Sequence, residues 1–429
     1  MPGRAKRLTM NISGTTRAVA LWLGRLGPGL LFAATAVGVS HLVQSTRAGA
    51  QFGLTLLVLI LLACVIKYPA FRFGAEYAAL TGRTVLSGYE RQGRWLLALI
   101  LLATFIEGVG VVPAVTLVTV GLGMNLLGAH VDAMIATVAT VFVASIVLLL
   151  GRYRVLENIT RVFVALFAIL TVLATLAAIA GIDPGQALVA PFELTEANLF
   201  FSVSVAGWMP IGLGGSIFLS AWVIARARTS GQAASTRVAL FDFHVGYITS
   251  LILAFCFLIM GTVVLLGREV ELAGSSAGFA AQFVGIFTEV IGQWTELVVS
   301  VAAITVMLST VLAVVDGFPR VYANVVKKLA GGAGVPSEER LYRGFLWFQI
   351  VTSGVVLYAL PRSFGAFIDF ITALGFLTGP VVAFMNHRIM FYGEIPPDRQ
   401  PPRWVRHWSV AGTTILALIF PIYLYFRLT

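Results

Sequence analysis

The sequence is poor in charge. Only 11% of its 429 residues are Asp, Glu, Lys or Arg, whereas 59% are hydrophobic. A soluble domain needs about 25% charged residues to cover its surface. Uninterrupted apolar runs such as FGLTLLVLILLACVIKYPAF reach the roughly 20 residues that cross a bilayer as a helix. They lack the alternation of an outer-membrane barrel, so the chain is predicted to be an all-α polytopic membrane protein.

Other absences narrow the function. The two cysteines, Cys64 and Cys256, both lie in apolar runs, so neither a disulfide framework nor a zinc cluster is expected. No glycine-rich phosphate loop indicates ATP as the energy source. No nucleophile, base and acid stand in a pattern typical of an intramembrane enzyme. We expect no cofactor, and an enzyme or a sensor that does not transport is the less favoured reading.

The apolar runs predict about eleven membrane helices. Their ranges are 26–51, 53–72, 95–122, 131–151, 162–182, 198–225, 243–267, 290–316, 344–361, 364–387 and 408–426. Residues 1–25 form a basic segment without a small-residue cleavage site after a compact apolar core, which predicts a retained cytoplasmic tail.

The positive charges set the expected orientation. With the N-terminus in the cytoplasm, all but four of the 29 Lys and Arg residues fall in inner segments, Lys67 among them. The four exceptions are Arg47, Arg268, Arg362 and Arg427. This bias is typical of an inner (plasma) membrane protein, and it explains the net charge of +10 without a nucleic-acid partner. The lipid bilayer is the expected partner, and the sequence assigns no oligomeric state.

Two of the predicted helices carry residues that interrupt helical geometry. The first contains AVGVSHLVQST at mid-depth, and the sixth contains AGWMPIGLGGS. Non-helical backbone at this depth is tolerated where it is buried in protein or lines a wet cavity. A matched pair of breaks in two halves of a chain points to the central site of a transporter. Glycine and proline also allow close packing and kinks, the simpler alternative.

The spacing of the breaks predicts an internal repeat. The sixth helix follows the first by five, so helices 1 to 5 (26–182) and helices 6 to 10 (198–387) are expected to be inverted copies, followed by an eleventh helix at 408–426. The pattern predicts a secondary-active transporter.

The residues around both breaks resemble those of a known family. GPGLLFAATAVGVSHLVQSTRAGAQFG, the following KYP and the later AGWMP are similar to the NRAMP (natural resistance-associated macrophage protein) family of divalent-metal transporters. The resemblance implies a LeuT-type fold with an additional eleventh helix. It also implies transport by alternating access, commonly of a metal ion together with a proton.

The chain departs from the motifs of that family. The helix 1 signature Asp-Pro-Gly-Asn, which supplies metal oxygens, is replaced by Gly38, Val39, Ser40 and His41. The alanine carbonyl and the methionine sulfur of helix 6 map onto Ala206 and Met209, but the two family histidines map onto Ile211 and Ser216. A divalent ion at mid-membrane depends on an anionic ligand, so this member is expected to have an altered site.

The expected substrate site therefore has two readings. The candidate substrate-binding residues are Gly38, Ser40, His41, Gln44, Ala206 and Met209. His41 and Met209 form a soft donor set for a metal ion, whereas free backbone groups at broken helices also suit a small polar organic solute. The alternative is that neither residue binds a substrate: His41 would then be hydrogen-bonded to a neighbouring helix, and Met209 would only fill space in the core.

Ionisable side chains inside the apolar runs are the remaining candidates. Glu107 is the deepest acid and, with His41, the candidate for proton coupling; the alternative is a structural pair of Glu107 with a basic group such as Arg47. Asp369 is expected to pair with Arg362. Asp242 is expected at a solvated surface.

Overall fold

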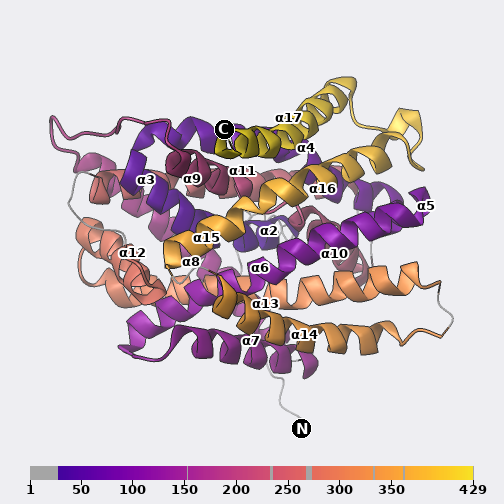
Figure 1. Ribbon diagram of the computed structural model, residues 1–429, viewed down its shortest axis with the longest axis horizontal. Helices are drawn as coiled ribbons and strands as arrows, with labels where there is room; N and C mark the ends of the chain where they lie inside the picture. Colours follow the sequence, from indigo (N-terminus) through magenta and orange to yellow (C-terminus); the bar gives the residue numbers. More distant parts are fainter. Residues whose placement is uncertain are drawn as a thin grey trace, which may run out of the picture.

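The computed structural model describes residues 28–151, 153–231, 235–266, 273–331, 334–360 and 363–428. The predicted tail at 1–25 and the predicted partner Arg362 lie outside these residues. The described residues form helices and no β-strand, and helical segments run along the long axis of the molecule (Figure 1).

The helices follow one another as four groups along the chain. The first group is α2 (Pro28–Ala36), the π-helix η1 (Ser40–Ser45), α3 (Thr46–Phe52), the 3-10 turn η2 (Leu54–Leu56), α4 (Leu57–Thr81) and α5 (Val85–Gln92). Next come α6 (Arg94–Leu127), α7 (Ala133–Leu149) and α8 (Tyr153–Ala180). The third group is α9 (Glu196–Gly207), α10 (Gly215–Ser230), α11 (Thr236–Leu265), α12 (Ser276–Ile291) and α13 (Thr295–Leu329). The last is α14 (Glu338–Ala359), α15 (Phe364–Ala373), α16 (Gly375–Phe391), η3 (Pro397–Arg399) and α17 (Arg403–Leu428).

Six helical segments in the described part are long and apolar enough to cross a membrane. They are Leu54–Thr81, Arg94–Leu127, Val162–Ala180, Thr236–Leu265, Thr295–Leu329 and Phe364–Phe391. Large apolar side chains such as Leu102, Ile169 and Leu297 are exposed on their outer faces, at 57%, 58% and 63%. Such faces are stable against lipid and unfavourable against water. The chain is a multi-pass membrane protein.

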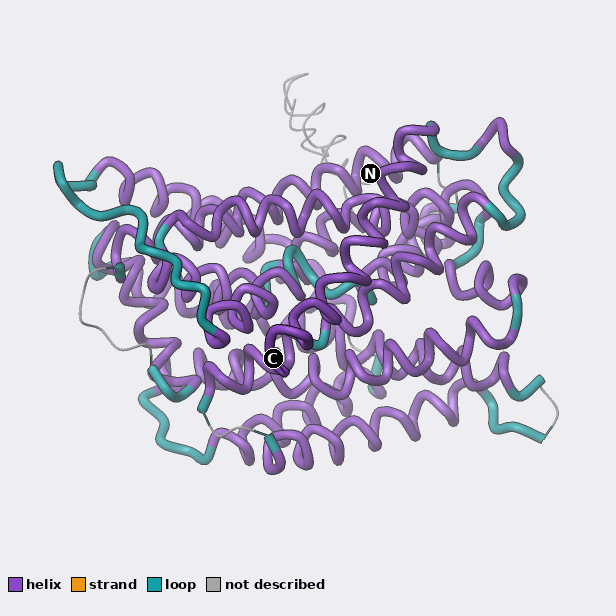
Figure 2. Tube along the Cα trace, turned by 45° about the horizontal axis from the view of Figure 1, so that its top comes forward, coloured by secondary structure: helices purple, strands orange, loops and turns teal. Residues whose placement is uncertain are grey.

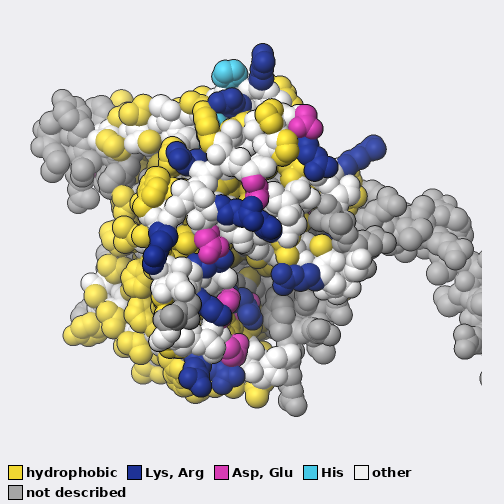
Figure 3. All heavy atoms as spheres, turned by 90° about the vertical axis from the view of Figure 1, so that its right-hand side faces the viewer, with side chains coloured by type: hydrophobic (Ala, Val, Ile, Leu, Met, Phe, Trp, Pro, Cys, Tyr) yellow, Lys and Arg dark blue, Asp and Glu magenta, His cyan; other side chains and the backbone are white. Residues whose placement is uncertain are grey.

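Charged side chains gather on one end of the molecule. Figure 3 shows Lys, Arg, Asp and Glu on the end face where α5 lies in Figure 1. We term this end the basic face. Its ion pairs include Arg91–Glu394 and Lys328–Glu90. The orientation of this face toward the cytoplasm stays a prediction, and two of the cations assigned to inner segments, Lys67 and Arg72, are buried at 1% and 9% exposure.

The structure adds elements that periodicity did not predict. α5 and α12 were not expected, and α4 and α13 extend beyond the apolar runs to Thr81 and Leu329. The predicted tenth helix is divided at Leu374 into α15 and α16. Neighbouring helices stabilise these polar extensions, whereas apolar composition marks only the part of a helix that lies in lipid.

The long helices α6 and α13 pack along each other and form one wall of the interior. α11 packs against α2 and α3, and α10 packs against α4. Figure 2 shows non-helical segments at the centre of this bundle, surrounded by helices. The interior is where both breaks lie.

Candidate functional site

Helix 1 loses regular geometry at mid-depth. α2 ends at Ala36, Val37 and Gly38 form a turn, and the chain resumes as the π-helix η1. The Gly38 amide donates to Ala36 O at 2.7 Å instead of to the carbonyl four residues back. π-helical turns of this kind are rare and occur often at functional sites. The predicted break in helix 1 is confirmed.

Helix 6 breaks at the matching place. α9 ends at Gly207 and α10 begins at Gly215, with non-helical backbone between them. Gly207 is required for the close approach of α15, because a Cβ there would lie 2.1 Å from Thr372 O. The two breaks touch each other: the Ser40 hydroxyl lies 3.0 Å from Pro210 O. The predicted break in helix 6 is also confirmed.

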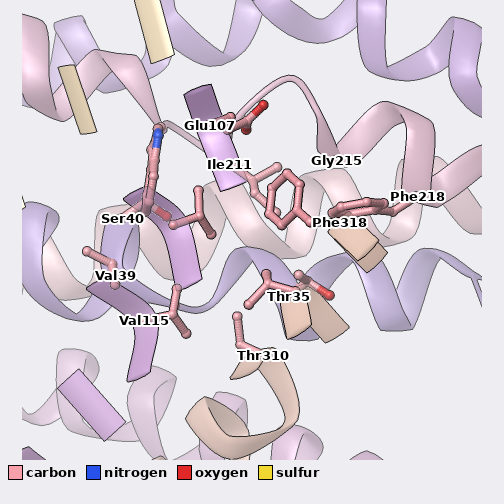
Figure 4. Close-up of a pocket in the computed structure, with 15 residues that line it drawn as sticks. Thr35, Val39, Ser40, Glu107, Val115, Ile211, Gly215, Phe218, Thr310 and Phe318 are labelled. Carbon is pink, nitrogen blue, oxygen red and sulfur yellow. The ribbon is translucent and has the colours of Figure 1, made fainter. Parts of the chain in front are cut away.

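A cavity of about 40 Å³ lies between the breaks. This is room for a few water molecules. It is lined by Thr35, Gly38, Val39, Ser40, Glu107, Val111, Val115, Trp208, Ile211, Gly212, Gly215, Phe218, Thr310, Val314 and Phe318. Figure 4 shows side chains from α2, α6, α10 and α13 around this space. Most of the wall is apolar, so its few polar atoms dominate what it can bind.

Glu107 is the acid of this cavity. It lies on α6, is 5% exposed, and holds its carboxylate against the break of helix 6. A Cβ at Gly212 would be 2.0 Å from Oε1, and one at Gly214 would be 2.4 Å from Oε2. The backbone amide of Gly214 lies next to the Glu107 carboxylate. Within the described residues, however, Oε2 has no hydrogen-bond partner at good geometry. Trp208 Nε1, on the same cavity, is likewise buried without a partner among the described residues. Both atoms are enclosed by protein, so contact with a ligand requires the surrounding backbone to move.

Lys67 is a site residue that the sequence reasoning missed. It lies in α4, and its ammonium donates to Ala206 O at 2.7 Å and to Gly207 O at 2.6 Å. It also lies 5.8 Å from the Phe376 ring centre and interacts electrostatically with Glu107. The prediction that Lys67 lies among the charges of the inner surface is wrong. The available signal was a lysine inside the apolar run LLACVIKYPAF, which is costly in lipid and therefore functional by default.

Gln44 belongs to a polar network on the α3 side of the cavity. Its amide nitrogen donates to Ser204 Oγ, Asp369 Oδ1 and Thr372 Oγ1 at 2.9, 3.0 and 3.0 Å. Arg47 donates to Gln44 Oε1 at 2.9 Å and forms a two-bond pair with Asp369 at 2.6 and 3.0 Å. These five side chains, termed the gate network, join helix 1 to α9 and α15.

The gate network corrects two predictions. Arg47 pairs with Asp369, so it is not the partner of Glu107, and Asp369 has a basic partner other than the predicted Arg362. Asp242 is also misplaced by the sequence: it is 3% exposed, and its carboxylate accepts the Gly29 amide at 2.8 Å. In each case the partner is distant in the chain, where periodicity gives no signal.

The other predicted ligands lie near the breaks in different environments. His41 is fully buried, with Nε2 donating to Ser250 O at 2.8 Å and Nδ1 lying 2.9 Å from Ser40 Oγ. Met209 is fully buried in the break of helix 6, and Ala206 O accepts from Lys67. Neither His41 nor Met209 is among the residues that line the cavity. Across the described ranges, no three His, Cys, Asp or Glu residues cluster as metal ligands do.

A known protein is similar to this chain over most of its length. An uncharacterized protein of Pasteurella multocida, PM0681, is 32% identical over 375 residues, which cover 86% of this chain and 85% of that protein. No known protein-family model matches the chain.

Solved structures of a manganese transporter from Eremococcus coleocola are similar in fold. Two mutant forms superpose with a TM-score of 0.68 at 15% identity, covering 96% of this chain and 88% of theirs. A complex of that transporter with an aromatic bis-isothiourea substituted compound gives 0.66 at 16% identity, with the same coverage. The predicted all-α, LeuT-type fold of the NRAMP transporters is confirmed.

Proposed function

Because this chain belongs to the same family as the Pasteurella multocida protein PM0681 and has the NRAMP fold, we propose that it is a secondary-active transporter. In this proposal a small cargo binds at the paired breaks of helices 1 and 6. The membrane is the inner (plasma) membrane, with the N-terminus in the cytoplasm, and the two halves move so that the site opens to one side at a time.

One observation carries the proposal. Two helices lose regular geometry next to each other around a buried cavity, and beside it lie polar atoms of Glu107 and Trp208 that have no hydrogen-bond partner among the described residues. A protein that only needed a stable bundle would not keep unpaired polar atoms and broken helices at its centre, because each is unfavourable away from water. A ligand that bonds to these atoms accounts for both.

Two cargo classes are consistent with the fold. The likeness to a manganese transporter favours a divalent metal ion. The engagement of both His41 nitrogens and the hydrogen bond from Lys67 to Ala206 O favour a small polar organic solute. In either case Glu107 is the residue that we assign to proton coupling, since it is buried, ionisable and open to the cavity.

Thiol accessibility tests alternating access without knowledge of the cargo. Val314 lines the cavity from α13, and its neighbour Val315 is fully buried outside the lining. In a background with Cys64 and Cys256 replaced by alanine, Val314→Cys is expected to react with an impermeant thiol reagent applied from either side of the membrane. The matched control Val315→Cys is expected to stay unreactive. Reaction of Val314→Cys from one side alone, in every condition, contradicts the proposal.

A further inference from the structure

The carbonyl groups of Ala206 and Gly207 lie at the end of α9. The last four carbonyls of a helix lack partners within it, and the helix dipole places partial negative charge at this end. α9 ends at Gly207 in the middle of the protein, where Ala206 O accepts one long hydrogen bond of 3.4 Å from the Met209 amide. Such a pair of oxygens at a half-helix end is suited to bind a cation.

Lys67 already occupies this position. Its ammonium lies 2.7 and 2.6 Å from the two carbonyl oxygens, and the face of Phe376 covers it at 5.8 Å. Gly375 approaches so closely that a Cβ there would lie 2.4 Å from Gly207 O. The oxygens are thus enclosed between α4 and the break of helix 10, and the ammonium meets them with full hydrogen-bond geometry.

The charged groups around the breaks are few. Lys67 interacts electrostatically with Glu107. The nearby Arg47 and Asp369 neutralise each other in the gate network. A divalent ion bound to the carbonyl oxygens of Ala206 and Gly207 would lie next to the Lys67 amine, in a medium of low dielectric where its charge is costly. A molecule without net charge adds no such penalty.

We propose that Lys67 is a built-in cation that occupies the carbonyl oxygens of Ala206 and Gly207 and excludes divalent metal ions, so that the cargo is a small polar molecule without net charge. When the breaks move, its recognition uses two buried atoms without a hydrogen-bond partner among the described residues, the acceptor Glu107 Oε2 and the donor Trp208 Nε1. This inference rests on the proposed function and names the substrate class of the same site.

Binding of Mn²⁺ to the purified full-length protein tests it. Free Mn²⁺ is followed by its electron paramagnetic resonance signal during titration of the wild type, Lys67→Ala, Lys67→Met, Lys67→Arg and the exposed control Lys327→Ala. The wild type, Lys67→Arg and Lys327→Ala are expected to leave the signal unchanged. In Lys67→Ala or Lys67→Met the ammonium is lost, so the signal of free Mn²⁺ is expected to fall, with an affinity about tenfold or more above that of the wild type. Adding Glu107→Gln to either variant is expected to remove this gain in affinity.

Each outcome is decisive. Tight Mn²⁺ binding by the wild type overturns the inference, and so does silence of Lys67→Met when its melting curve shows that it is folded. Neither result affects the thiol test on Val314→Cys, which reads alternating access without any cargo. Failure of the proposed function and failure of this inference are therefore separate observations.

Discussion

At the scale of single residues, the site depends on a side chain that lies directly against the backbone of glycine residues. Glu107 lies against Gly212 and Gly214 because neither has a Cβ. This contact brings an acid of α6 to the backbone of the helix 6 break, where cargo and proton meet in the proposed mechanism. The glycines are thus required for position, beyond their freedom to leave helical geometry.

Gly214→Ala tests this contact. The new methyl group would overlap Oε2 of Glu107, and overpacking of a buried site costs about 1 to 3 kcal/mol. We expect a lower thermal unfolding temperature for Gly214→Ala, and recovery when Glu107→Ala is added. The control Gly123→Ala has open space around its Cβ and is expected to be neutral or stabilising. Equal destabilisation in the presence and absence of Glu107→Ala would show that the contact is unimportant.

Glu107→Gln tests the assignment of the coupling residue. The amide keeps the size of the carboxylate and cannot take up a proton, so coupling should be lost while the cavity persists. Proteoliposomes with an internal pH indicator, exposed to Mn²⁺ or to a panel of amino acids, report proton entry with the cargo. Proton entry seen with wild-type protein is expected to disappear in Glu107→Gln. Unchanged proton entry in the variant would exclude Glu107.

At the scale of helices, we propose that the gate network closes one side of the cavity. It joins the second half of helix 1 to α9 and α15, which lie toward the end of the molecule opposite the basic face (Figure 1). Gln44, Ser204 and Thr372 are fully buried, and Arg47 and Asp369 nearly so. Opening toward this end requires these bonds to break.

Asp369→Asn is the variant that weakens this closure. It leaves the Arg47 guanidinium buried without an anionic partner, and breaking such a pair costs about 3 to 5 kcal/mol. Thermal unfolding in detergent should show a large loss, and Val314→Cys should react faster from the face opposite the basic one. Glu339→Gln removes an exposed partner of Arg343, worth about 0 to 1 kcal/mol, and is the control. Similar effects of both changes would mean that the network is not a gate.

At the scale of the whole molecule, composition predicted the class, the density of glycine and proline predicted both helix breaks, and the resemblance to the NRAMP family predicted the fold. These features are local, since AVGVSHLVQST and AGWMPIGLGGS carry the signal within a few residues. The pairings of Arg47 with Asp369 and of Lys67 with Ala206 connect residues far apart in the chain, so one sequence could not reveal them. The division of the predicted tenth helix at Leu374 was missed for a different reason. Neither a proline nor a pair of glycines immediately precedes Leu374, so the local sequence resembles a continuous helix.

The central claim is that the two ends of this bundle open in alternation, and distances across each end test it most directly. Spin labels at Gln51 on α3 and Ser363 before α15 report one end, and labels at Thr229 on α10 and Asp398 in η3 report the basic face; all four residues are exposed. Pulsed electron resonance on the full-length protein is expected to show two distances for each pair. Asp369→Asn should favour the longer distance at the first pair and the shorter one at the second. One unchanging distance at both ends would contradict the account.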